Sequence, residues 1–133
     1  MEKISIRSSS SNQFINITQE VSNFVRNSGI KEGLCIVYSP HTTGGITINE
    51  AADPDVVYDI IKELKKVIPD HDNYRHGEGN SSAHIKCSLM GASVQIPVTG
   101  GNLALGTWQG VFFCEFDGPR NRSVFIQIIG KQE

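Results

Sequence analysis

The sequence lacks the features that mark several broad classes of protein. No stretch approaches the roughly 18 consecutive apolar residues of a membrane-spanning helix. The first residues, in which Ile4 and Ile6 alternate with polar residues, contain no apolar core of the kind found in a signal peptide. The formal net charge is −2, so no excess of lysine and arginine offers a general field for nucleic acid. We therefore expect a soluble cytoplasmic protein that binds neither membranes nor nucleic acids.

Cysteine is scarce and shows no pattern. The three cysteines, Cys35, Cys87 and Cys114, are far apart and form no CxxC pair. Cys35 and Cys114 lie in apolar segments, where a free cysteine behaves as a small hydrophobic residue. An odd, unpaired set of this kind suits a reducing compartment better than a secreted disulfide framework.

The common catalytic and nucleotide-binding motifs are also missing. The chain has no Walker A motif, no GxGxxG, no HExxH and no GxSxG nucleophile elbow. Two glycine pairs, Gly44-Gly45 and Gly100-Gly101, either bring backbone amides to an anion or simply form turns. We therefore expect any functional site to be formed by polar residues that match none of these motifs.

What the sequence does contain predicts one domain spanning 1–133, because this length suffices for a real hydrophobic core. We expect helices at 18–28, with Thr18 as N-cap, at 53–68, with Asp53 as N-cap and Pro54 in the first turn, and at 82–90. Strands are expected at 4–7, 14–17, 34–38, 46–48, 94–98, 103–105, 111–116 and 123–129. The run at 34–38 is continuously apolar, as in a central strand covered on both faces, and the last two strands are expected to form a hairpin. The fold class is α+β, a single compact domain with mixed or antiparallel β-sheets and two to three helices.

The polar segment at 74–86 carries most of the candidate chemistry. It contains Arg75, His76, Glu78, His84 and Lys86, and it leads into the helix expected at 82–90. The first N–H groups of that helix offer a place for an anion, and a cation such as Lys86 could add to it. The residues from 70 to 82 show no strand or helix pattern, and loops of that length without regular structure are usually functional or disordered.

Histidine is the most suggestive residue type. His41 follows the apolar strand at 34–38, while His76 and His84 belong to the polar segment. Neutral imidazole is the commonest ligand for zinc, but the spacing matches no closed zinc motif, so solvated histidines are an equal alternative. For His71, which follows Asp70 in a fully polar stretch, the solvated alternative is favoured.

Two residues interrupt otherwise apolar segments and leave alternatives open. Glu115 stands within the strand expected at 111–116; it is either paired inside the fold, with Arg120 or Arg122 as candidates, or exposed on an edge strand. Trp108 either stacks on a planar ligand ring or belongs to the core, and the core position is somewhat favoured on general grounds.

The order of several short motifs resembles one known family. These motifs are HTT at 41–43, TINE at 47–50, DP at 53–54, YRH at 74–76, AHIK at 83–86, GAS at 91–93 and LGTWQG at 105–110. Together they closely resemble the YjbQ-like family, often labelled secondary thiamine-phosphate synthase. Where some members carry a histidine two residues before the position of His84, this chain has Ser82.

The resemblance implies a homotrimer with a histidine site that holds a divalent metal, Zn²⁺ or Mg²⁺. It implies a transferase activity that joins hydroxymethylpyrimidine diphosphate to thiazole phosphate and releases pyrophosphate, so that the partner is a small phosphorylated heterocycle. By matching position, the catalytic residues would be His41, His84, Glu78 and Arg75, and the metal ligands would be His41, His76 and His84. Substrate and phosphate contacts are expected from Lys86, Thr42, Trp108, Gln109 and Arg120.

Two other functions remain as alternatives. One is a non-catalytic trimeric module that binds a metal or a metabolite. The other is a metal-dependent hydrolase in which Glu78 acts as the base towards a metal-activated water.

Overall fold

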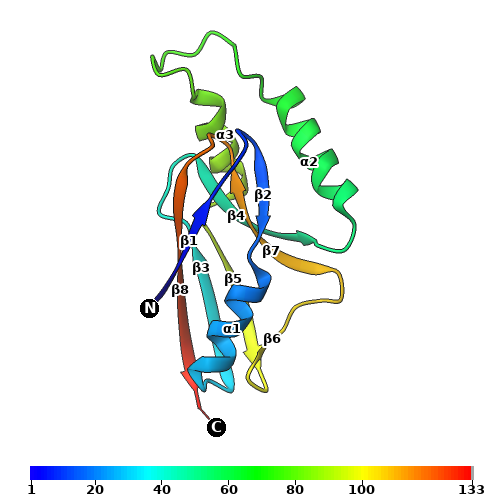
Figure 1. Cartoon of the computed structure of the whole chain (residues 1–133), viewed down its shortest axis with the longest axis vertical. Helices are drawn as coiled ribbons and strands as arrows, with labels where there is room; N and C mark the ends of the chain where they lie inside the picture. The colour runs from blue at the N-terminus through cyan, green and yellow to red at the C-terminus, as the bar shows by residue number, and fades with distance from the viewer. Residues whose placement is uncertain (133) are drawn as a thin grey trace.

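The chain folds around two antiparallel β-sheets that pack against each other (Figure 1). This computed structural model describes residues 1–132. The five-stranded sheet has the order β1-β8-β3-β5-β6 and the three-stranded sheet has the order β2-β7-β4. Because neighbours in each sheet come from distant parts of the sequence, most of the pairing is long-range.

The five-stranded sheet contains the apolar run predicted at 34–38 at its centre. Its strands are β1 (Glu2–Arg7), β8 (Asn121–Lys131), β3 (Glu32–Tyr38), β5 (Ser93–Thr99) and the short β6 (Asn102–Leu103). β3 lies between β8 and β5, with Val37 opposite Ile126 on one side and Val94 on the other. The predicted central position of this strand is therefore confirmed.

The three-stranded sheet is built around a strand that is buried over almost its whole length. Its strands are β2 (Gln13–Asn16), β7 (Gln109–Glu115) and β4 (Gly44–Glu50). β7 lies in the middle and is buried from Gly110 to its end. It is buried because one face packs on the five-stranded sheet and the other on a helix.

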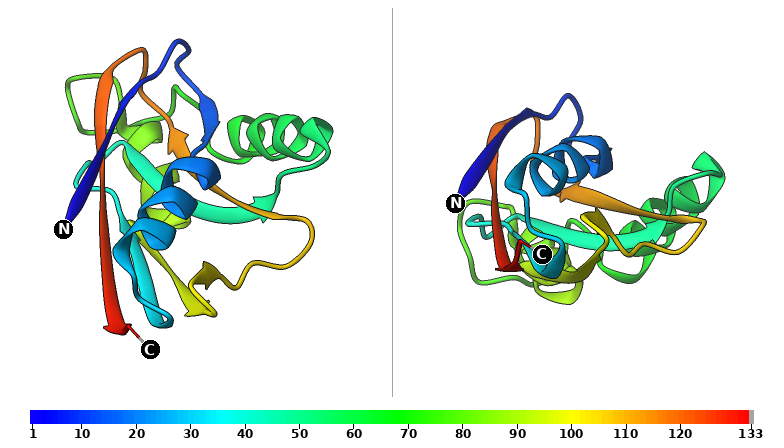
Figure 2. Two further views of the ribbon diagram at one scale, coloured as in Figure 1. Left: turned by 60° about the horizontal axis from the view of Figure 1, so that its bottom comes forward. Right: turned by 90° about the horizontal axis from the view of Figure 1, so that it is seen from below.

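Three helices complete the fold, as predicted. α1 (Thr18–Ser28) contributes Val21 and Val25 to the core between the sheets, and α3 (Ser81–Met90) packs on the opposite face of the three-stranded sheet. α2 (Pro54–Val67) extends away from the body of the molecule (Figure 2). It contains no buried residue, and only Val57 and Leu64 reach the cluster under α3.

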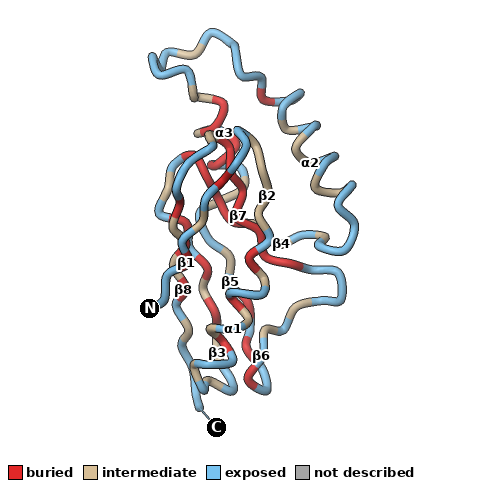
Figure 3. The backbone as a smooth tube through the Cα atoms, viewed as in Figure 1, coloured by how far each residue is buried: buried red, intermediate tan, exposed pale blue. Residues whose placement is uncertain are grey.

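The core follows the two-residue period of the strands. On β7, Val111 and Phe113 point into the space between the sheets, whereas Phe112 and Cys114 point to α3. On β8, Val124 and Ile126 point into the same space as Val111. Figure 3 shows these buried stretches running along the strands, while α2 and the loop that follows it are mostly exposed. Cys35, Cys87 and Cys114 are free and buried, and for Cys35 and Cys114 this agrees with the apolar setting expected from the sequence.

Three local predictions need correction. The N-cap of α1 is Ile17, because Thr18 already belongs to the helix and donates its hydroxyl to Asn16 Oδ1 over 2.6 Å. β7 and β8 do not form a hairpin; they belong to different sheets, so the connection at 116–120 crosses from one sheet to the other. The strand expected at 103–105 is only the two-residue β6.

The other helix start is as predicted, since Asp53 caps α2 through a hydrogen bond from the Asp55 N–H to Asp53 Oδ1 at 3.0 Å. The α+β class and the antiparallel pairing are confirmed. None of the helices within residues 1–132 is long and apolar enough to cross a lipid bilayer.

Candidate functional site

A polar cavity of about 430 Å³ lies where the β3–β4 loop, the start of α3 and the β7–β8 connection meet. It gathers segments that are far apart in the sequence, and three of the four histidines line it. The complete lining is Pro40, His41, Thr42, Thr43, His76, Glu78, Asn80, His84, Asp117, Arg120 and Arg122. Its size is within the usual range for small-molecule sites.

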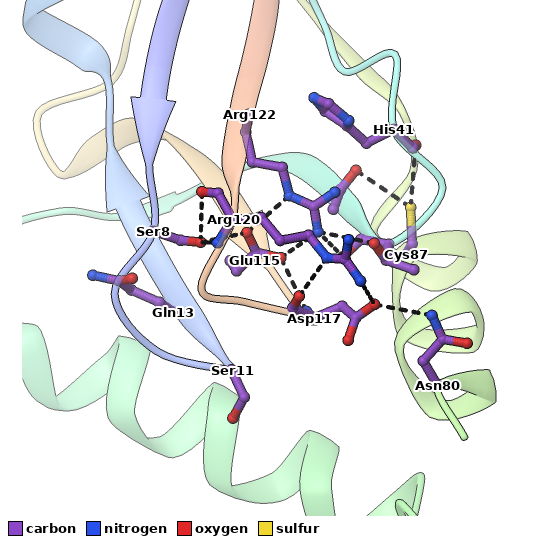
Figure 4. A network of polar contacts seen from close by, with 12 residues as sticks. Ser8, Ser11, Gln13, His41, Asn80, Cys87, Glu115, Asp117, Arg120 and Arg122 are labelled. Atoms are coloured by element: carbon purple, nitrogen blue, oxygen red, sulfur yellow. Dashed lines mark hydrogen bonds and ion pairs between the residues drawn. The ribbon is translucent and has the colours of Figure 1, made fainter. Parts of the chain in front are cut away.

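A buried ion pair forms the floor of this region (Figure 4). Glu115 is completely buried and Arg122 is 6% exposed, and Arg122 Nε donates to Glu115 Oε1 at 2.8 Å while Nη2 contacts Oε2. Ser8 Oγ donates to Oε1 at 2.7 Å and the Asp117 N–H donates to Oε2 at 2.9 Å. The paired alternative for Glu115 is thus the one realised, with Arg122 as its partner.

The charge state of Glu115 follows from these contacts. Burial by itself raises the pKa of this carboxyl group. The hydrogen bonds from Arg122, Ser8 and the Asp117 backbone outweigh that effect, so the pKa lies below its ordinary value of 4.5. Glu115 is therefore an anion near neutral pH and neutralises Arg122.

Arg122 also fixes the loop that carries His41. Its Nη2 donates to Thr43 Oγ1 at 2.8 Å and to the Thr43 carbonyl at 3.3 Å. Within the loop, Ser39 Oγ donates to the Gly44 carbonyl at 2.7 Å. Gly44 is required here, because a Cβ at this position would collide with the ring of Phe113. The loop is therefore held at both of its ends.

His41 is held by β8. The Ser123 backbone N–H donates to His41 Nε2 at 2.9 Å, and the His41 ring meets the edge of Phe113 with 6.2 Å between the ring centroids. Burial and the neighbouring charge of Arg122 lower the pKa of His41. Because Nε2 accepts a hydrogen bond, the proton of the neutral ring lies on Nδ1.

His76 and His84 form a pair on the opposite wall. Their ring centroids are 5.6 Å apart and the rings are nearly perpendicular. His84 comes from the first turn of α3, whereas His76 comes from the loop before it. His76 Nε2 lies 3.8 Å from Glu78 Oε1, a loose contact between two largely exposed side chains.

The third wall is an ion pair at the β7–β8 connection. Arg120 Nη2 donates to Asp117 Oδ2 at 2.9 Å and its Nε donates to the Asp117 carbonyl at 2.8 Å. Asn80 Nδ2 donates to the same Oδ2 at 2.9 Å, so the start of α3 is joined to this connection. The Arg120 side chain is 52% exposed, and water competes with the pair there.

A metal held by His41, His76 and His84 does not fit this geometry. Residues 1–132 include no group of three His, Cys, Asp or Glu side chains spaced to hold a metal ion. His41 also uses its one ring lone pair to accept the hydrogen bond from Ser123. What this chain brings together is the pair of His76 and His84, with Glu78 beside it.

Several other predicted site residues do not line this cavity. Lys86 is 1% exposed and points inward, where Nζ donates to Asn12 Oδ1 at 3.1 Å. Trp108 is 64% exposed, so it is not a core residue, and Gln109 accepts a hydrogen bond from the Gly106 N–H at 2.8 Å on the β6–β7 loop. Arg75 lines a neighbouring cavity of about 420 Å³ that shares His76 and His84.

The predicted residues that do meet are His41, Thr42, His76, Glu78, His84 and Arg120. Sequence reasoning missed Asn80 and Asp117 as cavity residues, and it treated Arg122 only as one of several possible cations. The inward position of Arg122 could have been predicted from strand alternation, because Arg122 lies on the same face of β8 as Val124 and Ile126. In the same way, Glu115 lies on the same face of β7 as Phe113. Ser82, at the position of the absent histidine, is buried and donates to Asp70 Oδ1 at 3.0 Å.

Comparison with known proteins places this architecture in one family. The family profile described as "UPF0047 protein YjbQ-like" matches residues 2–131. The UPF0047 protein YugU of Bacillus subtilis is 47% identical over 98% of this chain and 99% of its own length. A UPF0047 protein of Methanocaldococcus jannaschii is 48% identical over 96% of this chain and 93% of its own.

Solved structures agree with these sequence matches. The crystal structure of an uncharacterized conserved YjbQ/UPF0047 protein from Clostridium acetobutylicum superposes with a TM-score of 0.96, at 55% identity, over 97% of this chain and 100% of that one. A protein of unknown function from Sulfolobus solfataricus superposes with a TM-score of 0.95 at 32% identity, over 98% and 96% of the two chains. The chain therefore belongs to the YjbQ-like UPF0047 family.

Proposed function

We propose that the cavity binds a small phosphorylated heterocycle and that the protein is a transferase of the thiamine-phosphate synthase type. The supporting observation is the convergence of His41, His84, Arg120 and the Thr42–Thr43 turn on one cavity of suitable size. Imidazole N–H, guanidinium and hydroxyl groups are donors, and phosphate oxygens are acceptors. The reaction is the one that the family resemblance implies, and the hydrogen-bond donors of the cavity suit its diphosphate leaving group.

In this reaction the bond between the pyrimidine methylene carbon and the diphosphate oxygen breaks, and the diphosphate leaves with the bonding electron pair. The lone pair of the thiazole nitrogen then forms the new carbon–nitrogen bond. The protein needs to stabilise negative charge that develops on the diphosphate more than it needs a nucleophile. Mg²⁺, which proteins usually bind together with substrate phosphates, would enter with the diphosphate group.

Arg120 is the cation best placed for this role. Arg122 is buried and neutralised by Glu115, whereas Arg120 is half-exposed and paired with Asp117 at the cavity rim. A diphosphate could replace Asp117 as its partner without leaving a buried charge unpaired. Charge-assisted hydrogen bonds of this kind contribute about 1.5–3 kcal/mol each, so an Arg120→Ala variant should bind diphosphate roughly 10- to 100-fold more weakly.

The test is direct. Purified protein is incubated with hydroxymethylpyrimidine diphosphate, thiazole phosphate and Mg²⁺, and thiamine phosphate is measured. His84→Ala and Arg120→Ala should reduce product formation, while His71→Ala and Arg26→Ala, which alter exposed residues outside the cavity, should not. Absence of product, or equal product from His84→Ala and His71→Ala, would refute the proposal.

A non-catalytic metabolite-binding protein is the second candidate. It is favoured by one observation: both arginines of the cavity already have carboxylate partners, as in a site built for reversible binding. Stoichiometric binding of diphosphate without product would support it. The hydrolase alternative depends on a metal centre, for which the described residues of one chain supply no group of three donors.

We also propose that copies of the chain associate, as a homotrimer in the form that the resemblance implies. The face of the five-stranded sheet that points away from the core carries Tyr38, 45% exposed, and Ile129, 50% exposed. Tyr38 stacks on Phe125 of the neighbouring strand, with 6.4 Å between ring centroids. Exposed apolar side chains on a sheet face are a common contact between subunits. Light scattering on the purified protein measures the assembly, and a monomer would refute the proposal.

A further inference from the structure

His41 is held in a way that fixes which of its ring nitrogens carries the proton. The Ser123 backbone N–H donates to Nε2 at 2.9 Å. A backbone amide cannot give up its proton, so Nε2 must offer a lone pair as long as this contact is present. None of the hydrogen bonds formed among residues 1–132 uses Nδ1, and this nitrogen is not among the buried atoms that lack a partner.

A neutral imidazole has one nitrogen with a lone pair and one with a hydrogen. With Nε2 used by Ser123, His41 has no second lone pair for a metal ion or for a proton taken from a substrate. The remaining function of the ring is to donate through Nδ1–H. Since His41 lines the polar cavity, a ligand there is the available acceptor.

We propose that His41 is a fixed neutral donor, which presents Nδ1–H to a phosphate oxygen of the ligand and serves neither as a metal ligand nor as a general base. The identity of the acceptor rests on the function proposed above. The tautomer does not, because it follows from contacts within the protein alone.

The charged groups around His41 favour the neutral ring. The positive charge of Arg122 of β8 would repel an imidazolium, and protonated Nε2 would face the Ser123 N–H as donor against donor. Glu115 of β7 acts in the opposite direction, but its charge is already shared with Arg122. Across the cavity stand His84 of α3, His76 and Glu78 of the preceding loop, and the Asp117–Arg120 pair. The arrangement resembles other sites in which a neutral imidazole polarises an oxygen.

The tautomer can be observed by nitrogen-15 NMR on protein labelled in histidine, without ligand or metal. The His41 signals are assigned as those that disappear in His41→Leu. We expect the Nδ1–H tautomer at pH 7 and no change in these signals when Zn²⁺ is added. An Nε2–H tautomer, an imidazolium at pH 7, or direct Zn²⁺ coordination by His41 would overturn the proposal.

The donor function is tested by replacing His41 with one side chain that keeps an N–H donor and with one that has none. The amide of asparagine can place an N–H near the position of Nδ1, whereas leucine fills the space without a donor. With inorganic pyrophosphate as probe, His41→Asn should bind within about threefold of the unmodified protein and His41→Leu about tenfold or more weakly. Thermal unfolding of both variants establishes that they are folded.

The possible failures are distinguishable. If the unmodified protein does not bind pyrophosphate but His41 shows the Nδ1–H tautomer, the proposed function fails and the assignment of the proton stands. If His41→Leu binds pyrophosphate as well as the unmodified protein does, the phosphate contact of His41 is refuted whatever its tautomer.

Discussion

Replacing Glu115 by glutamine should destabilise the fold strongly while keeping the shape of the side chain. The carboxylate accepts four hydrogen bonds, two from Arg122 and one each from Ser8 and the Asp117 N–H. The glutamine amide keeps one oxygen but turns the other into an NH₂ group. In either orientation that group faces the Arg122 guanidinium, which is also a donor.

The expected magnitude follows from burial. Glu115 is 0% and Arg122 6% exposed, so the variant leaves a cation without a counter-charge where water hardly reaches it. Breaking a buried ion pair by removing one partner costs about 3–5 kcal/mol. For a chain of this size, that corresponds to a fall in Tm of about 10–20 °C.

Urea and thermal unfolding, followed by circular dichroism, measure the effect. Glu63→Gln on the exposed side of α2 is the matched control and should change stability by no more than about 0.5 kcal/mol. The double variant Glu115→Leu with Arg122→Met removes both charges and should recover much of the loss. A loss below about 1 kcal/mol in Glu115→Gln would refute the view that this pair holds the end of the core.

The same pair predicts a dependence on acid. The pKa of Glu115 in the folded protein lies below 4.5, so its contribution to stability is present above that pH and is lost as the pH falls through the folded pKa. The unmodified protein should therefore lose stability below about pH 4.5, and Glu115→Gln should show less of this loss. Equal acid profiles of the two proteins would assign the acid sensitivity to other carboxylates.

Three further predictions concern other parts of the molecule. Lys86 is buried with a single neutral hydrogen-bond acceptor, and burial lowers its pKa. Lys86→Met should therefore leave the free energy of unfolding unchanged or raise it by about 1 kcal/mol at pH 7, without changing pyrophosphate affinity. Weaker pyrophosphate binding by this variant would mean that Lys86 contributes to the site. Gly44→Ala should destabilise by about 1–3 kcal/mol in urea unfolding and should also weaken pyrophosphate binding, since the new methyl group meets Phe113 and displaces the His41 loop. Tyr38→Asp should convert the assembly to monomers in light scattering, and dissociation by Tyr58→Asp alone would move the subunit contact to α2.

Most of the fold could be predicted because local and tertiary preferences agree. Asp53 and Pro54 begin α2 as their chemistry requires, and the apolar run of β3 occupies the centre of its sheet. The β7–β8 hairpin was the main error. Two strands joined by a short polar segment usually pair, but β7 needs apolar cover on both faces and finds it between the five-stranded sheet and α3. The burial of Phe112 and Phe113 on opposite faces of β7 favours its pairing with β2 and β4 over a hairpin with β8. The residues of the β7–β8 connection do not indicate this.

The site was predictable in its residue types but not in its details. The resemblance named His41, His76 and His84, and these do line one cavity. That Lys86 points inward could not be foreseen from its place one turn after the start of α3, since it depends on Asn12 from the β1–β2 loop and on Phe116. The proposal that His41 is not a metal ligand rests on one backbone N–H of β8, which no sequence pattern shows.

The cavity lies where the inward-facing positions of β7 and β8 change from apolar to charged residues. Val111 and Phe113 on β7, and Val124 on β8, fill the space between the sheets, and the next inward positions are Glu115 and Arg122. A charge at the end of each strand is possible only because the two meet, and Arg122 then has an Nη2 donor left for Thr43. The ion pair thereby connects the packed core to the loop that presents His41.

This connection makes the first wall of the cavity unlike the opposite one. The wall of His41, Thr43 and Arg122 is anchored in both sheets, whereas His76 and Glu78 come from an exposed loop whose hydrogen bonds around Tyr74 are local, such as the one from Tyr74 Oη to the Pro69 carbonyl at 2.6 Å. Regions with few buried contacts open at lower cost than the core does. A ligand should therefore find the donors of the first wall in place and order the second wall around itself. Amide hydrogen exchange tests this directly: pyrophosphate should slow exchange in residues 71–79 and leave β7 unchanged. Equal protection of both segments would mean that the two walls respond as one unit.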